Sequence, residues 1–557
     1  MKDDKMAKGE RPVIGRASAT ERVPNESSAF NFWLGPQERV NPFDIVESTH
    51  EVKEGAQSKT YGIVTNIEQM TDAPSHLSNY IANDFGNLSE PVQTPRIGAN
   101  VATVEVLSNT AEDYMPVQNG AETRFADEQG ILSALGIDKV RPEDRVPAGL
   151  IEMSNGEQFP VFFERRYLLG PDGAHVNISG ISGLATKTSY AMFLIQSILQ
   201  SSKAGDVAVI VLNVKQDDLL HIDKPPKPSL SKEDLDRWQR LGLTPREFEN
   251  THYLLPWGKK SPGSPNCHGE PPDQYTVYAY ALQDAADKLD MLVNVPDPWS
   301  TLGPLIGEIQ QGVRNKEPKW KNVLTWQDLL NTLPLMDKGV PQKVGEVAPS
   351  SVGRFVRILR RVVQNRTSGL FVSQRSKNVV NLGDHLGREI KGGHTYVVDI
   401  ARLTDDEKAL VFGHIIQTVH GLYVEGESER DLPEKTLIFV DELNKYAPAS
   451  RQQDESSILP YVIDIAARGR SQGVILVSAE QFMSQVHDQV TGNCSTKVIG
   501  RSDAAELEAS SYRFIPSREM KNHLTRLDQG DLLVAHPRFR KPIRIKFPRP
   551  AYYQLGQ

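Results

Sequence analysis

The sequence predicts an α/β fold in two parts, a small β-barrel near the N-terminus and a larger domain built on a parallel sheet. Short β-like runs separated by Gly, Pro and Asp fill residues 30–163, which is typical of a small antiparallel barrel or sandwich. From residue 170 onward, buried strand-like runs alternate with helix-like segments, which is typical of βαβ units. The 557 residues are enough to bury more than one hydrophobic core.

The composition is that of an ordinary globular protein, and the formal net charge is -8. This balance excludes a chain coated in positive charge, so any nucleic-acid contact must come from a local patch or a lined channel. The two cysteines, Cys267 and Cys494, cannot form a disulfide framework, and we expect a reducing, cytoplasmic location. The charged start lacks the apolar segment of a signal peptide.

No apolar stretch reaches the ~20 residues that span a bilayer. We therefore expect no membrane anchor, which argues against secretion or conjugation motors that are tethered by one. Residues 1–27 are polar and charged, and we expect them to be disordered. The barrel domain is expected over residues 28–165, and its β-like runs lie at 43–46, 60–64, 98–107 and 158–163.

Residues 166–557 are expected to form the parallel-sheet domain. Residues 223 to about 350 hold Pro-rich linkers and amphipathic stretches, which predicts a helical insertion. The C-terminal run 537–549 alternates basic and apolar residues and predicts an edge strand with one basic face. A helix is predicted at 188–202. Buried apolar runs predict the strands of the sheet at 174–179, 207–214, 395–400, 436–440 and 474–478.

The segment that follows the first of these strands predicts a phosphate-binding loop. The usual pattern G-x-x-x-x-G-K-[ST] is not met, because Ile181 and Thr186 stand where the two glycines belong. Backbone N–H groups that open a helix still attract anions, Lys187 can reach the β and γ phosphates, and the Thr188 hydroxyl can ligate Mg²⁺. The alternative is an ordinary Gly/Ser loop beside a core helix. The expected nucleotide contacts are Gly180, Gly183, Leu184, Ala185, Thr186, Lys187, Thr188, Ser189 and Asp441.

A second candidate is the apolar run at 438–440, which ends in Asp441 and Glu442. Two acids at the end of a buried strand are costly unless they face a metal or a polarised water. We expect Asp441 to join the Mg²⁺ shell and Glu442 to orient and deprotonate the attacking water. The alternative is a solvated turn.

A third candidate is the turn that contains Arg468 and Arg470, followed by a strand that ends near Gln481. An arginine supplied across a subunit boundary stabilises the charge that develops in phosphoryl transfer. Gln481 is expected to sense the γ phosphate or to position water. A surface Arg-Gly-Arg turn and a glutamine at the edge of the core are the alternatives, with equal weight.

Other features carry less weight. A predicted helix places Arg354, Arg357 and Arg361 on one face, which favours a solvated face over phosphate contact. Asn213 and Lys215 follow the second strand and lie near the expected nucleotide-binding edge.

The order of these parts resembles the HerA family of ring ATPases, within the HerA/FtsK group. The likeness is carried by the barrel-like region, the loop ending at Lys187 and Thr188, the pair Asp441-Glu442, the turn at 467–470 and the segment 478–481. It implies a RecA-like P-loop motor in which Lys187 and Thr188 match the Walker A pair and the two acids match the Walker B pair. Thr186 departs from the family pattern, which has Gly there.

The resemblance also implies ATP and Mg²⁺ as cofactors, an arginine-finger role for Arg468 and Arg470, and a hexamer that encloses double-stranded DNA. It implies a translocase or helicase that works with a partner nuclease or another effector, docked on the barrel, in anti-phage defence. Two other hypotheses stay open. The chain could be an ATP-binding scaffold that activates a partner enzyme, or a globular protein without turnover.

Overall fold

In the computed structural model, the chain forms two compact units. The first, here the barrel unit, comprises Met1–Glu164, Ile515–Arg526 and Asp531–Lys546. The second, here the sheet unit, comprises Arg165–Phe514, Leu527–Gly530 and Phe547–Gln557. The described residues are 11–53, 56–89, 91, 96–112, 114–181, 186–203, 205–258, 264–292, 302–333, 336–337, 340–341, 343–344, 347–364, 368–424, 432–449 and 458–554.

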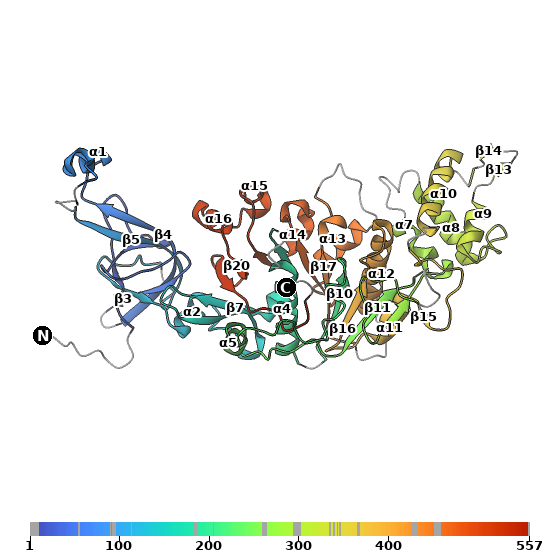
Figure 1. Cartoon of the computed structure of the whole chain (residues 1–557), viewed down its shortest axis with the longest axis horizontal. Coiled ribbons are helices and arrows are strands. Elements are labelled where there is room, and N and C mark those ends of the chain that lie inside the picture. The colour runs from blue at the N-terminus through green and yellow to red at the C-terminus, as the bar shows by residue number, and fades with distance from the viewer. Residues whose placement is uncertain are drawn as a thin grey trace. The chain divides into compact units, whose positions relative to one another are not determined.

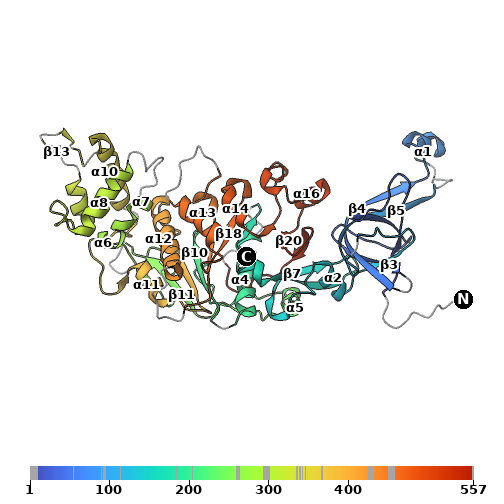
Figure 2. The ribbon, with the colours of Figure 1, turned by 180° about the vertical axis from the view of Figure 1, so that it is seen from behind.

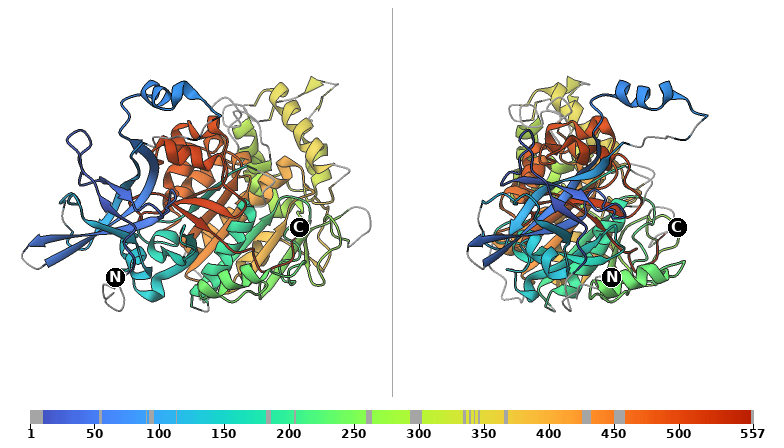
Figure 3. Two further views of the ribbon diagram at one scale, coloured as in Figure 1. Left: turned by 60° about the vertical axis from the view of Figure 1, so that its left-hand side comes forward. Right: turned by 90° about the vertical axis from the view of Figure 1, so that its left-hand side faces the viewer.

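The barrel unit contains a closed six-stranded barrel in the order β1-β2-β5-β4-β3-β6 (Figure 1). Its side chains alternate between inside and outside: in β2, Phe30 and Phe32 are buried while Trp33 is exposed. Figure 3 shows α1 (His76–Ala82) beyond the ends of β4 and β5. The barrel strands are β1 Gly15–Ala17, β2 Ala29–Leu34, β3 Ile45–Lys53, β4 Ala56–Thr71, β5 Gly98–Asn109 and β6 Glu122–Phe125.

The barrel begins and ends earlier than the sequence predicts. β1 pairs with both β2 and β6, so the disorder expected up to residue 27 is wrong for this strand. The run at 158–163 is a strand, but it lies outside the barrel and pairs with β7, in the strand order β20-β21-β7-β8. β21 therefore has a neighbour on each side and is not an edge strand. Those four strands are β7 Arg145–Glu152, β8 Gln158–Glu164, β20 Asp531–Ala535 and β21 Ile543–Lys546.

The sheet unit is built on parallel strands in the order β15-β12-β11-β16-β10-β17-β18-β9-β19 (Figure 2). Apart from the half-buried Lys435 at the start of β17, the central strands are buried along their length and mostly apolar, as expected for a sheet covered on both faces. The predicted α/β class, an N-terminal barrel followed by a parallel-sheet domain, is confirmed. The strands are β9 Val176–Ser179, β10 Val207–Asn213, β11 Thr251–Pro256, β12 Thr276–Tyr278, β15 Val379–Val380, β16 Thr395–Asp399, β17 Lys435–Asp441, β18 Val474–Glu480 and β19 Thr496–Ile499.

Helices cover both faces of this sheet. The connection from β9 to β10 runs one way along the sheet, and those from β16 to β17 and from β17 to β18 run the other way. Because such crossovers are right-handed, α4 (Thr186–Ser201) covers one face, and α12 (Asp405–Val424) and α13 (Leu459–Arg468) cover the other. On the α4 face, the ring of Phe193 packs 5.4 Å from that of Trp238 on α5 (Lys232–Arg240).

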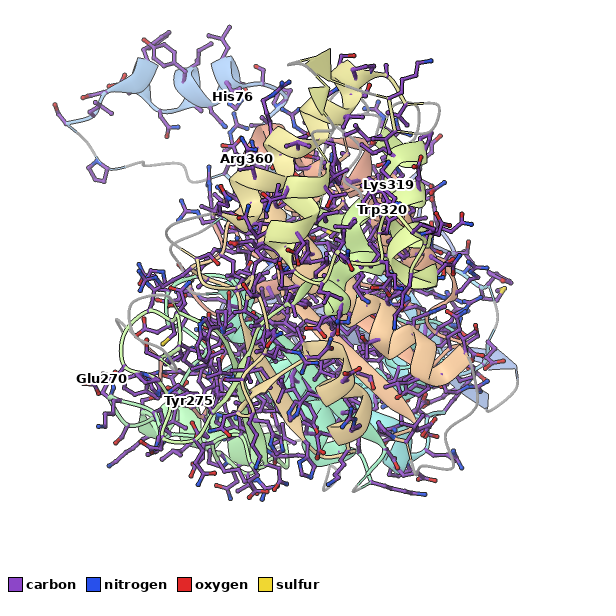
Figure 4. All side chains as sticks on the ribbon, turned by 90° about the vertical axis from the view of Figure 1, so that its right-hand side faces the viewer. His76, Glu270, Tyr275, Lys319, Trp320 and Arg360 are labelled. Atoms are coloured by element: carbon purple, nitrogen blue, oxygen red, sulfur yellow. The ribbon has the colours of Figure 1, made fainter. Side chains whose placement is uncertain are left out.

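The predicted insertion at 223–350 is not entirely helical, because β11 and β12 lie within it and extend the main sheet beside β16. The helices that follow β12 share one core with α12 and α13. Figure 4 labels Lys319, Trp320 and Arg360 in this helical part, where the Lys319 ammonium lies 5.0 Å from the centre of the Trp320 ring. The helices are α6 Leu282–Ala285, α7 Leu289–Leu292, α8 Gly303–Asn315, α9 Trp326–Thr332 and α10 Pro349–Val363.

The amphipathic helix α10 buries Phe355 and Leu359 and exposes Arg354 and Arg357. Arg361 pairs with Asp406 at 2.8 Å. This is the solvated basic face that the sequence favours. Within the described ranges, none of the helices combines the length and the apolar character needed to traverse a bilayer.

Phe355→Ala is expected to lower the free energy of unfolding of the sheet unit by about 3–5 kcal/mol, because it empties a fully buried position. Arg354→Ala, one residue away on the exposed face, is the matched control and should stay within about 0.5 kcal/mol of wild type. Urea denaturation followed by circular dichroism measures both. Equal effects of the two variants would contradict the assigned faces of α10.

Candidate functional site

The candidate site lies within the sheet unit, at the carboxyl ends of four adjacent strands. β10 ends at Asn213, β17 at Asp441, β18 at Glu480 and β9 at Ser179. Parallel register brings these ends together: Asp441 is opposite Ala479, and Glu480 is opposite Ser179. In parallel sheets of this kind, ligands bind at this edge.

Lys187 and Thr188 lie in the first turn of α4, directly beside the acids of β17. The Thr188 Oγ1 lies 3.4 Å from the Asp441 Oδ2. The Lys187 side chain is only 7% exposed, and burial lowers its pKa while the Asp441 carboxylate opposes the shift. The two clusters that the sequence singles out, about 250 positions apart, therefore converge on one point.

The loop that precedes α4 is described only in part. Gly183, Leu184 and Ala185 lie outside the described residues. Gly180 has a φ of +153°, and a Cβ there would lie 3.2 Å from the Gly500 Cα, so this position requires glycine.

The other end of the predicted loop is anchored on α4. Thr186 is the first residue of this helix. The next predicted contact, Ser189, accepts a hydrogen bond from the Gln554 Nε2 at 3.1 Å.

Two lysines hold the acids in place. The Lys215 Nζ lies 3.0 Å from the Asp441 Oδ2 and 3.1 Å from the Glu442 Oε1. The Lys445 Nζ lies 2.5 Å from the other Glu442 oxygen, Oε2. Burial alone would raise the pKa of Glu442, but the hydrogen bonds from Lys445 and Lys215 outweigh it and the pKa is lowered. Glu442 is therefore an ionised carboxylate at neutral pH.

The backbone of Glu442 is strained. It has a φ of +60°, in the left-handed region that side chains other than glycine seldom adopt. Its N–H donates to the carbonyl of Ala479 at 2.6 Å, which fixes the turn to the neighbouring strand. Strain of this kind persists where the surrounding structure determines the conformation, and it is frequent at active sites.

A third acid, Glu480, completes the cluster at the end of β18. Its side chain is fully buried and accepts a hydrogen bond from the Asn177 amide. Burial, followed by the negative charge of Asp441, raises the pKa of Glu480 well above its ordinary value. Among the described residues, the Asp441 Oδ1 and the Glu480 Oε2 are buried without a hydrogen-bond partner. The unpartnered Asp441 oxygen and the Thr188 hydroxyl beside this carboxylate are oxygen groups of the kind that suit Mg²⁺.

Arg468 and Arg470 do not lie at this edge. Both precede β18, so they lie at its amino end, while the acids lie at its carboxyl end, about 20 Å away at 3.3 Å per residue. Arg468 pairs with Asp464, and the Arg470 guanidinium donates to the carbonyl of Asp172 at 3.2 Å. Gln481 follows β18 directly, at the carboxyl edge, and is exposed.

Glu480 and Lys445 are site residues that the sequence motifs do not predict, and Lys215 carries little weight there. The signal for Glu480 was available, because an acid ending a buried strand is as unusual there as at Asp441. The lysines could not be found in the same way, since a lysine after a strand is common and only the fold shows which carboxylate it meets.

No protein-family model and no curated protein matches the chain. Solved structures of similar fold include the unbound bacterial conjugative coupling protein TrwBΔN70, which is 11% identical, covers 76% of this chain and 93% of its own, and has a TM-score of 0.47. VirB4 of Thermoanaerobacter pseudethanolicus is 14% identical and covers 72% and 96%, with a TM-score of 0.42. TrwB in complex with ADP and Mg²⁺ is 11% identical and covers 68% and 87%, with a TM-score of 0.43. These TM-scores are below 0.5, so the likeness assigns no functional residue here.

Glu480→Gln is expected to stabilise the protein at alkaline pH. Because the folded protein keeps the proton of this carboxyl where the unfolded chain releases it, the free energy of unfolding falls as pH rises above the ordinary glutamate pKa. An uncharged Gln removes this loss. We expect the variant to be more stable than wild type by about 1 kcal/mol or more at pH 8, and by less at pH 5.

Urea denaturation at the two pH values measures this difference. Glu270→Gln, at an exposed glutamate labelled in Figure 4, is the control and should show no such pH dependence. A wild type that is the more stable protein at pH 8 would contradict a protonated Glu480.

Proposed function

We propose that the chain is a Mg²⁺-dependent ATPase of the RecA-like P-loop type. The observation that carries the proposal is the contact between the Thr188 hydroxyl and the Asp441 carboxylate, with the buried Lys187 beside them. An ammonium, a hydroxyl at a helix N-terminus and two acids at the end of a neighbouring strand are the groups that bind a triphosphate and its metal.

Each group has a proposed task. Lys187 binds the β and γ phosphates, and the backbone N–H groups at the start of α4 donate to them. Thr188 and Asp441 hold Mg²⁺, which neutralises charge on the phosphates when it is bound. Glu442, held as a carboxylate, orients the attacking water and accepts its proton.

We further propose that the active form is a ring, in which Arg468 and Arg470 act on the site of a neighbouring copy. Their position at the amino end of β18 supports this, because neither can reach the phosphates of its own chain. Both side chains are exposed. Gln481, at the carboxyl edge, is proposed to sense the γ phosphate or to position the water.

The proposed substrate of the motor is double-stranded DNA. The resemblance to the HerA family supports this, together with a hexameric ring, a partner nuclease or other effector docked on the barrel, and a role in anti-phage defence. With a net charge of -8, contact with DNA must come from local basic groups, of which the exposed Arg354 and Arg357 of α10 are candidates.

The function is tested by the rate of ATP hydrolysis with and without duplex DNA. Wild type is expected to hydrolyse ATP with Mg²⁺ and to be stimulated by DNA. Glu442→Gln should bind ATP but lose at least about 100-fold in kcat, because it removes the base. Lys187→Ala should lose binding of a fluorescent ATP analogue, while the exposed Lys232→Ala should not. ATP hydrolysis that is stimulated only by a partner protein would favour the ATP-binding scaffold over the DNA motor. Unchanged ATP affinity in Lys187→Ala would refute the assigned nucleotide site.

The trans-acting arginines are tested by mixing two inactive variants. The double variant Arg468→Ala/Arg470→Ala is expected to bind ATP but not to hydrolyse it, and Lys187→Ala has no working site but keeps its arginines. If arginines act on a neighbouring copy, mixed rings recover part of the ATPase rate. Normal hydrolysis by the double variant, or an inactive mixture shown by light scattering to form mixed rings, would rule the idea out.

A further inference from the structure

A lysine outside the predicted Walker-type motifs lies where positive charge is needed in the site. The Lys215 Nζ contacts one oxygen of each acid, Asp441 Oδ2 and Glu442 Oε1, at 3.0 and 3.1 Å. The Thr188 hydroxyl lies 3.4 Å from the same Asp441 oxygen. The Lys215 ammonium thus contacts the Asp441 oxygen that, together with the Thr188 hydroxyl, would bind a divalent cation.

The turn that carries Lys215 is held rigidly. The buried Asn213, last residue of β10, donates from its side-chain amide to the carbonyl of Gln216 at 2.8 Å and to the Asp399 Oδ1 at 2.8 Å. Gln216 has a φ of +42°, in the left-handed region. The carbonyl of Asn213 also accepts from the N–H of Ile400 at 2.9 Å. A buried carboxylate on the next strand therefore fixes the turn that presents the lysine.

We propose that Lys215 is a positioning residue that competes with the divalent cation for Asp441, supplies positive charge there when no cation is bound, and orients Glu442. This inference rests on the proposed ATPase function and deepens it. Thr188 and Asp441 would hold the cation, and the ammonium of Lys215 would then give up Asp441 and keep Glu442, whose other oxygen contacts Lys445. Lys215 thus couples occupation of the metal site to the orientation of the catalytic carboxylate.

The chain offers a matched pair of lysines that separates competition from general electrostatics. Lys215 contacts both acids, whereas the Lys445 ammonium contacts Glu442 alone among the described ion pairs. Removing either lysine takes one positive charge from the same neighbourhood. Only the removal of Lys215 removes a group that competes with the metal for Asp441.

The test measures Mn²⁺ binding by electron paramagnetic resonance on the full chain, with a non-hydrolysable ATP analogue present. Lys215→Met is expected to bind Mn²⁺ about fivefold more tightly than wild type, the factor expected for a half-exposed ion pair. Lys215→Arg keeps the charge and should stay close to wild type. Lys445→Met and the exposed Lys232→Met should not tighten binding. Unchanged or weaker Mn²⁺ binding in Lys215→Met, or equal tightening in Lys445→Met, overturns the competition.

A second readout separates positioning from a merely structural effect. Lys215→Met is expected to lower kcat about tenfold or more with little change in the KM for ATP, because Glu442 loses one of its two lysine partners, and Lys215→Arg should restore part of the loss. An unchanged kcat overturns the positioning role. The proposed function has a separate test. Binding of Mn²⁺ and nucleotide that persists in Lys187→Ala would refute the site as a whole. Binding that is lost in Lys187→Ala but unchanged in Lys215→Met would refute only the role of Lys215.

Discussion

The carboxylate of Asp441 is the group on which the rest of the site depends. It is buried at the end of β17, where an ionised group is costly unless it is paired. The Lys215 ammonium and the Thr188 hydroxyl approach one of its oxygens, and the other has no hydrogen-bond partner among the described residues. Its charge adds to the burial that raises the pKa of Glu480, and it opposes the effect of burial on the pKa of Lys187.

The site is therefore a set of opposed charges that a parallel sheet holds together. Every acid in it ends a strand or follows one directly, so the backbone hydrogen bonds of the sheet fix the carboxylates before any ligand arrives. The strained turn at Glu442 and the left-handed residue at Gln216 lie at the same edge. Local strain of this kind is offset by the apolar strands behind it, whose residues are buried except for the half-buried Lys435 at the start of β17.

Much of this architecture was predictable because it follows from local patterns of apolar and polar residues in the sequence. Buried apolar runs predicted strands near those that became β9, β10, β16, β17 and β18. Elements joined by distant pairing were not predictable. The strand at 158–163 shows the same alternation whether it closes a barrel or pairs with β7, and β21 has a basic face whether it lies at an edge or between neighbours. β12 has only three residues, and β11 begins with polar residues and ends in a proline, so neither stood out from the segments around it.

The sequence by itself determined which chemical groups are present: the lysine and hydroxyl at 187–188, the two acids at 441–442, and the strands that carry them. Their order along the chain also predicted that they share one edge, since parallel strands align their carboxyl ends. Only the tertiary structure decided that Lys215, Lys445 and Glu480 join them and that Arg468 and Arg470 do not. The reason is that strand order in a sheet depends on non-local packing, and it sets which side chains meet at a given strand end.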